Sequence, residues 1–112
     1  MTSDTKLTQE QKFARKEMLL DLPAGSVMAR TEGGHTILVV PMGNTVQIST
    51  SICSEDENKC RRKVGEYHAL NRWYNGESIP MPAHDFSIFG IATAMGDSII
   101  RSDEGQYAVK EF

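Results

Sequence analysis

Basic residues spaced around a glycine are the part of this sequence best suited to chemistry. Arg61, Gly65, His68 and Arg72 follow one another at intervals of four, three and four residues, so a helix would bring them onto one side. Arginine and histidine can donate charge-assisted hydrogen bonds to phosphate, and arginine does so with a planar fork. A glycine inside a helix costs about 1 kcal/mol relative to alanine but allows close approach to the backbone. The pattern predicts an anion site.

The same residues also allow a structural interpretation, in which Gly65 lets a neighbouring strand or helix pack closely and the arginines form a solvated face. Trp73 projects away from the predicted core side, either to stack on a base or partner surface, or to cover a subunit interface or the N-terminal helix. Tyr67 is a second candidate for stacking. Arg30 and Arg101 lie on predicted strands, where they either converge on the pocket or remain surface residues.

Sequence signatures of catalysis are missing from the chain. There is no Walker-type phosphate loop, no dinucleotide glycine fingerprint and no nucleophile elbow. The histidines at 35, 68 and 84 share no ligand spacing with Cys53 or Cys60. We therefore expect a binding protein rather than an enzyme, with no metal and no cofactor.

The basic residues lie on a predicted long helix that begins at Ser54 and ends before Asn75-Gly76. Ser54 and Glu57 form a capping box, and the acids at 55–57 suit the positive end of the helix dipole. Its predicted length is about 30 Å. The side expected to face the sheet carries Cys60, Val64, Tyr67, Leu70, Asn71 and Tyr74.

The residues before this helix predict a shorter helix and an antiparallel meander. After a loose lead at 1–7, a Thr8–Gln11 capping box opens a helix at Gln9–Leu20, which ends at Leu22-Pro23. The predicted strands are Ser26–Thr31, Thr36–Val40 and Thr45–Cys53. The second is apolar throughout and should be buried on both faces. The third alternates, and we expect the long helix to cover its apolar side, which carries Val46, Ile48, Thr50 and Ile52.

The residues after Gly76 begin with a predicted loop at Glu77–Asp85, which contains Pro80 and Pro82. Residues 86–93 favour a strand, with a short helix as the alternative. A C-terminal hairpin is expected from Ser98–Arg101 and Gln106–Lys110 around Asp103-Glu104-Gly105. The predicted fold class is α+β, with an N-terminal helix, a three-stranded meander, a long central helix packed on the sheet and a C-terminal β-hairpin.

Length and composition predict one small domain that spans 1–112. The chain has 39% hydrophobic and 24% charged residues and a formal net charge of −3, which disfavours a general duplex-DNA surface. Five basic residues nevertheless lie between Lys59 and Arg72, with Glu66 as the one acid. Two cysteines, a polar N-terminus and the absence of a bilayer-length apolar run favour a reduced, cytoplasmic protein with no membrane partner. A Cys53–Cys60 bridge is the less favoured alternative.

Three segments give the chain a resemblance to small bacteriophage counter-defence proteins. They are Ile52-Cys53-Ser54-Glu55-Asp56-Glu57-Asn58, Arg62-Lys63-Val64-Gly65 and Ala69-Leu70-Asn71-Arg72. Over residues 36–73 the layout is similar to that of phage anti-Thoeris proteins, which sequester cyclic ADP-ribose-type immune signals. The resemblance implies a small antiparallel sheet with helices, a homo-oligomer and arginine-lined nucleotide pockets at subunit junctions.

Three functional hypotheses follow. The first is a phage protein that sequesters a small phosphate-bearing nucleotide in the host cytoplasm without cleaving it. The second is a protein-binding inhibitor of a host defence complex, similar to an anti-CRISPR or a nucleic-acid mimic. The third is a structural or regulatory phage protein with an adaptable, methionine-containing interface.

Overall fold

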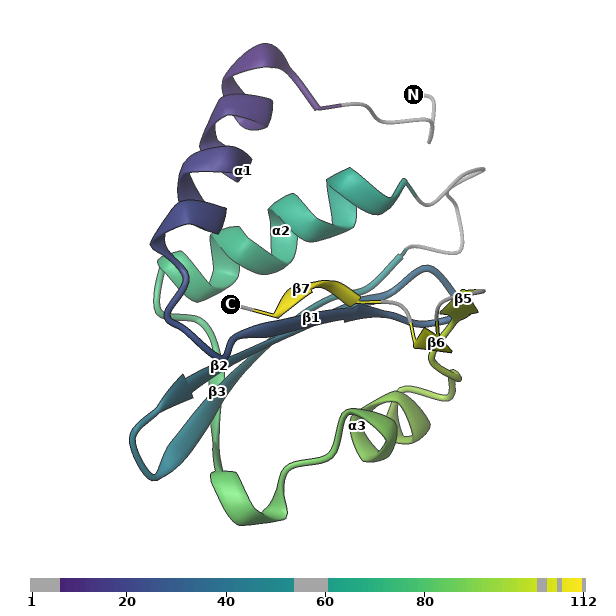
Figure 1. Ribbon diagram of the computed structural model, residues 1–112. Helices are drawn as coiled ribbons and strands as arrows, with labels where there is room; N and C mark the ends of the chain where they lie inside the picture. The colour runs from purple at the N-terminus through teal and green to yellow at the C-terminus, as the bar shows by residue number, and fades with distance from the viewer. Residues whose placement is uncertain (1–6, 54–60, 103–104, 107, 112) are drawn as a thin grey trace.

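The protein folds as a three-layer α+β structure with a sheet between helices (Figure 1). The computed structural model describes residues 7–53, 61–102, 105–106 and 108–111, and only the backbone of those after 100. Helices α1 (Gln9–Asp21) and α2 (Arg62–Tyr74) lie on one face of the sheet, and α3 (Ile88–Ala94) lies on the other. A short 3₁₀ turn, η1 (Ala83–Asp85), precedes α3.

The main sheet contains five strands in the described part of the chain, in the order β4-β3-β2-β1-β7. All of its pairings are antiparallel. Its strands are β1 (Val27–Arg30), β2 (Thr36–Met42), β3 (Thr45–Ser51), β4 (Ile79–Pro82) and β7 (Ala108–Glu111). The predicted β1-β2-β3 meander is confirmed.

Strand β2 forms the centre of the core, as its continuous apolar run predicts. Leu38 and Val40 join a cluster with α1 and α2, whereas Ile37 and Val39 join a second cluster with α3. All four side chains are buried. Fully burying an aliphatic side chain contributes about 1.5–3 kcal/mol, so β2 secures both outer layers to the sheet.

Helix α1 begins and ends close to where the sequence predicts. The Thr8 hydroxyl accepts from the Gln11 amide at 3.1 Å, and the Thr8 amide donates to the Gln11 side chain at 2.9 Å. This reciprocal pair is the predicted capping box and satisfies two otherwise unpaired groups. Leu22 is extended, as expected for a residue that precedes Pro23.

Helix α2 is shorter than predicted, because Arg61 has an extended backbone (φ −75°, ψ 133°) and serves as the N-cap. The predicted cap at Ser54 and Glu57, and Cys60, lie outside the described residues. The buried residues of α2 are Glu66, Ala69 and Leu70, and the expected core residue Tyr74 is 61% exposed.

The face of β3 that α2 covers also differs from the prediction. The Ser49 hydroxyl donates to the Ala69 carbonyl at 2.5 Å, so α2 packs against the Ser49 side of the strand. The apolar residues Val46 and Ile48 lie in the cluster under α3, and Ile52 is exposed. The alternating pattern identified an apolar face but not which helix would cover it.

Two predictions between Gly76 and Ala94 are wrong. The expected loop contains β4, an edge strand that pairs only with β3 in the described sheet, which is where prolines at 80 and 82 are tolerated. The favoured strand at 86–93 is instead the alternative, a short helix: the Ser87 hydroxyl accepts from the Gly90 amide at 3.2 Å and caps α3.

The C-terminal segment combines a small hairpin with an additional strand. Strands β5 (Arg101–Ser102) and β6 (Gly105–Gln106) pair as a hairpin that is shorter than the predicted one. Strand β7 then returns to pair with β1 at the edge of the main sheet, which the sequence did not predict.

The sulfur chemistry of Cys53 also departs from the expected reduced state. Cys53 is disulfide-bonded, and the chain's other cysteine, Cys60, lies outside the described residues. The bridge therefore replaces the expectation that Cys53 is a free thiol.

Candidate anion-binding site

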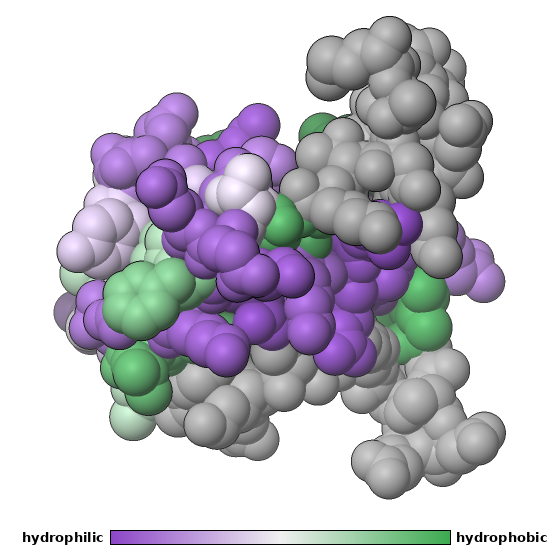
Figure 2. All heavy atoms as spheres, turned by 90° about the horizontal axis from the view of Figure 1, so that it is seen from above, coloured by the Kyte–Doolittle hydropathy of each residue, from purple (hydrophilic) through white to green (hydrophobic). Residues whose placement is uncertain are grey.

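A basic cavity of about 750 Å³ lies between the start of α2, the β1–β2 turn and the N-terminal end of α1. Basic side chains dominate the described lining, which contains one acid. The lining residues are Leu7, Lys12, Arg30, Glu32, Gly33, Gly34, Arg61, Arg62, Lys63 and Val64. Figure 2 shows the face that carries α1 and α2, where hydrophilic side chains cover much of the described surface.

The β1–β2 turn is fixed in place by the carboxylate of Asp97. The Thr31 hydroxyl donates to Asp97 Oδ2 at 3.2 Å, and His35 Nε2 lies 2.9 Å from the same oxygen. A side chain at Gly33 would collide with this carboxylate, which explains why a glycine occupies that position. His35 Nδ1 accepts from the Cys53 amide at 2.8 Å, so both ring nitrogens of His35 have partners. This histidine has a structural role in holding the turn beside the cavity.

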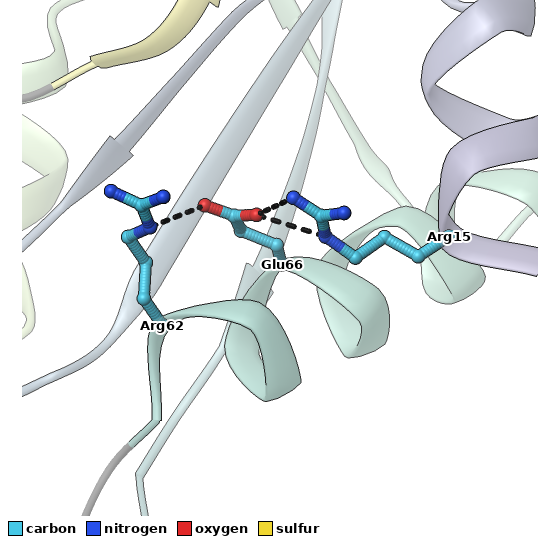
Figure 3. A network of polar contacts seen from close by, with 3 residues as sticks. All are labelled: Arg15, Arg62 and Glu66. Carbon is cyan, nitrogen blue, oxygen red and sulfur yellow. Dashed lines mark hydrogen bonds and ion pairs between the residues drawn. The ribbon is translucent and has the colours of Figure 1, made fainter. Parts of the chain in front are cut away.

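The buried carboxylate of Glu66 lies between Arg15 and Arg62 (Figure 3). Arg15 Nη2 and Nε donate to Glu66 Oε1 at 2.8 and 3.1 Å, and Arg62 Nε lies 3.4 Å from Oε2. The Glu66 side chain is fully buried. Glu66 orients one arginine from each helix, and Arg62 of this group lines the cavity.

Two of the sequence-predicted site residues, Arg30 and Arg61, line the cavity. Gly65 lies elsewhere: a Cβ at this position would be 2.5 Å from Thr36 Oγ1, so the glycine permits α2 to pack against β2. This corrects the expectation that Gly65 opens the helix backbone to an anion. His68 and Arg72 are exposed, and neither is among the described lining residues.

The aromatic candidates lie at the junction of the helices. Tyr67 and Trp73 are partly buried and pack against the cluster shared by α1, α2 and the sheet. Trp73 therefore packs against a core cluster to which the N-terminal helix contributes Met18. The backbone of Arg101 belongs to β5, and its side chain lies outside the description.

The sequence interpretation missed several residues of the cavity, namely Lys12, Glu32, Arg62 and Lys63. It assumed that Arg61 belongs to the helix and therefore grouped it with residues on later turns. The run Arg61-Arg62-Lys63 was the useful signal, because it places three consecutive cations at the start of α2. The Gly33-Gly34 turn joins two strands of the predicted meander, but the sequence interpretation did not identify it as a wall of the cavity.

Comparison with protein-family models, curated proteins and solved structures finds no match. Among the described residues, no helix has the length and apolar character needed to cross a membrane. The same part of the chain contains no group of three or more histidine, cysteine or acidic residues placed to hold a metal ion.

Proposed function

We propose that this protein binds a small phosphate-bearing nucleotide in the basic cavity and retains it without cleaving it. The observation that carries the proposal is the convergence of five basic side chains on one cavity in a chain with a net charge of −3. A cavity of about 750 Å³ is in the size range of small-molecule sites, about 300–1,000 Å³. A concave site with an excess of positive charge also concentrates anionic ligands.

The chemistry of the lining suits phosphate. Arginine forms bidentate contacts with phosphate oxygens, and lysine contributes a compact positive charge. The first turn of α2 contains no acid, so the positive end of its dipole adds to the field of Arg61 and Lys63. Arginine and lysine remain protonated at neutral pH and do not activate water as bases. The basic side chains of the lining therefore suit retention of an anion rather than its hydrolysis.

The proposed biological role is sequestration of a cyclic nucleotide immune signal by a phage counter-defence protein in the host cytoplasm, acting as a homo-oligomer. The sequence resemblance supports this role, since its Arg62–Gly65 segment forms the start of α2 and contributes three residues to the cavity. Those residues are Arg62, Lys63 and Val64.

The test combines ligand discovery with calorimetry. Mass spectrometry should identify a nucleotide released when the purified protein is heated, and ADP and cyclic ADP-ribose serve as defined probes. The double variant Lys12→Ala/Lys63→Ala should lower affinity for the bound probe by at least about 100-fold, because each lost charge-assisted contact is worth about 1.5–3 kcal/mol. Neither lysine forms an ion pair with a described residue, so the fold should tolerate both changes.

Arg72→Ala provides the matched control, since it removes an exposed charge of α2 from outside the described lining. It should leave affinity within about twofold of the wild-type value. Unchanged affinity of the double lysine variant would contradict the proposal. So would the absence of a released nucleotide together with failure to bind either probe. A stoichiometric protein partner in that case would favour the inhibitor hypothesis.

A further inference from the structure

A second cavity, of about 330 Å³, adjoins the first along α1. Its described lining consists of Leu7, Gln9, Lys12, Phe13, Arg15, Lys16 and Lys63. Leu7, Lys12 and Lys63 line both cavities. The two cavities are therefore neighbours, and both lysines are shared between them.

The smaller cavity differs from the larger one because it contains an aromatic ring. Phe13 is 67% exposed, although the hydrophobic effect favours burial of a phenylalanine ring. Lysines at 12, 16 and 63 and Arg15 share the lining with this ring. An exposed aromatic ring among cations is the combination that binds nucleotides, because the bases stack on the ring while the cations hold the phosphates.

Arg15 contributes to this arrangement with a fixed orientation. Its Nε and Nη2 both donate to the buried Glu66, and its side chain is only 13% exposed. The guanidinium group thus cannot swing freely into either cavity. It lines the smaller cavity in a fixed position, and guanidinium planes can stack against aromatic groups.

We infer that the smaller cavity is a base subsite. The nucleobase of the ligand stacks on Phe13, and its phosphates extend past Lys12 and Lys63 into the larger cavity. This inference rests on the proposed function and narrows its ligand class. The ligand combines an aromatic base with at least a diphosphate and reaches both cavities, whereas inorganic phosphates occupy the larger cavity alone.

The inference is tested by comparing ADP with pyrophosphate in calorimetry of the full-length protein. Phe13→Ala should weaken ADP binding by about tenfold, because stacking of a base on an aromatic side chain contributes on this scale. It should leave pyrophosphate affinity within about twofold. Phe13→Trp should retain ADP affinity, since it preserves a stacking surface. Leu20→Ala is the matched control, because Leu20 is an 81% exposed apolar residue of α1 outside the described lining of both cavities.

Different results identify different failures. If Phe13→Ala binds ADP like the wild type while Lys12→Ala/Lys63→Ala does not, the base subsite is disproved and the phosphate site stands. Equal losses of ADP and pyrophosphate affinity in Phe13→Ala would also overturn the inference, since they would show a structural effect. If the wild-type protein binds neither probe, the inference fails together with the proposed function. A loss of self-association in Phe13→Ala, with ADP affinity unchanged, would assign the ring to a contact between copies.

Discussion

Arg15 and Glu66 join the two helices of one layer through a bidentate contact in which two guanidinium nitrogens share one carboxylate oxygen. The donors Nη2 and Nε lie 2.8 and 3.1 Å from Glu66 Oε1. The residues are 51 positions apart, so the contact fixes α1 against α2 rather than stabilising either helix locally. Arg62, the second partner of the buried Glu66, lines the larger cavity.

Glu66→Gln should lower the free energy of unfolding by about 3 kcal/mol. Removing one member of a buried ion pair is costly because the remaining charge stays desolvated, and here Arg15 is the largely buried partner. Urea denaturation of the two proteins measures the difference. Glu17→Gln, at an exposed position of α1, should change stability by less than about 0.5 kcal/mol. Similar values for both variants would show that the buried pair contributes little.

Thr8→Ala should destabilise the protein by about 1 kcal/mol, because it removes the oxygen that accepts from the Gln11 amide at the start of α1. Thermal and urea unfolding would detect this loss. Thr8→Ser should restore most of the stability, since serine caps helices as well as threonine does. A serine variant as unstable as the alanine variant would show that the methyl group, and not the hydroxyl, matters.

The parts of the fold that the sequence predicted are those determined by local chemistry. The Thr8–Gln11 cap and Leu22-Pro23 define α1 without reference to the rest of the chain. The apolar run in β2 predicted that both faces of this strand are buried, whichever helices cover them. These features depend on backbone hydrogen bonding and on burial, which can be recognised in short segments.

The wrong predictions concern choices between distant partners. The alternation in β3 could not show that α3 would cover Val46 and Ile48, because α3 itself was taken for a strand. Likewise, Pro80 favoured a loop in the sequence interpretation. Proline is tolerated in β4 because β4 is an edge strand, and that position is known only from the full strand order. The cavity is a tertiary feature of the same kind, and the predicted site residues included only Arg30 and Arg61 of its described lining.

Gly65→Ala should destabilise the protein although alanine favours helices more than glycine does. The new Cβ would lie 2.5 Å from Thr36 Oγ1, and the resulting overpacking costs about 1–3 kcal/mol, against a propensity gain of about 1 kcal/mol. We expect a net loss of about 1 kcal/mol in urea denaturation. In the Thr36→Ala background the colliding oxygen is absent, so the same substitution should become neutral or stabilising. Additive effects of the two substitutions would mean that Gly65 and Thr36 do not interact.

Asp97→Ala should loosen the turn that walls the cavity and weaken nucleotide binding. Asp97 accepts a hydrogen bond from the Thr31 hydroxyl and pairs with His35. His35 in turn accepts a hydrogen bond from the Cys53 amide. Without the carboxylate, amide exchange at Cys53 and in residues 31–35 should accelerate, since local opening becomes easier. Because Glu32, Gly33 and Gly34 line the cavity, affinity for ADP should also fall, by about three- to tenfold.

The control for this variant is Asp85→Ala, which removes an exposed aspartate that also lies beside a histidine. Asp85 Oδ1 is 3.5 Å from His84 Nε2, and both side chains are mostly solvent-exposed. Surface pairs of this kind contribute about 0–1 kcal/mol, so exchange around the turn and ADP affinity should not change. Unaltered exchange in Asp97→Ala would show that the turn holds its shape without this carboxylate. Faster exchange with full ADP affinity would show that the turn does not take part in binding.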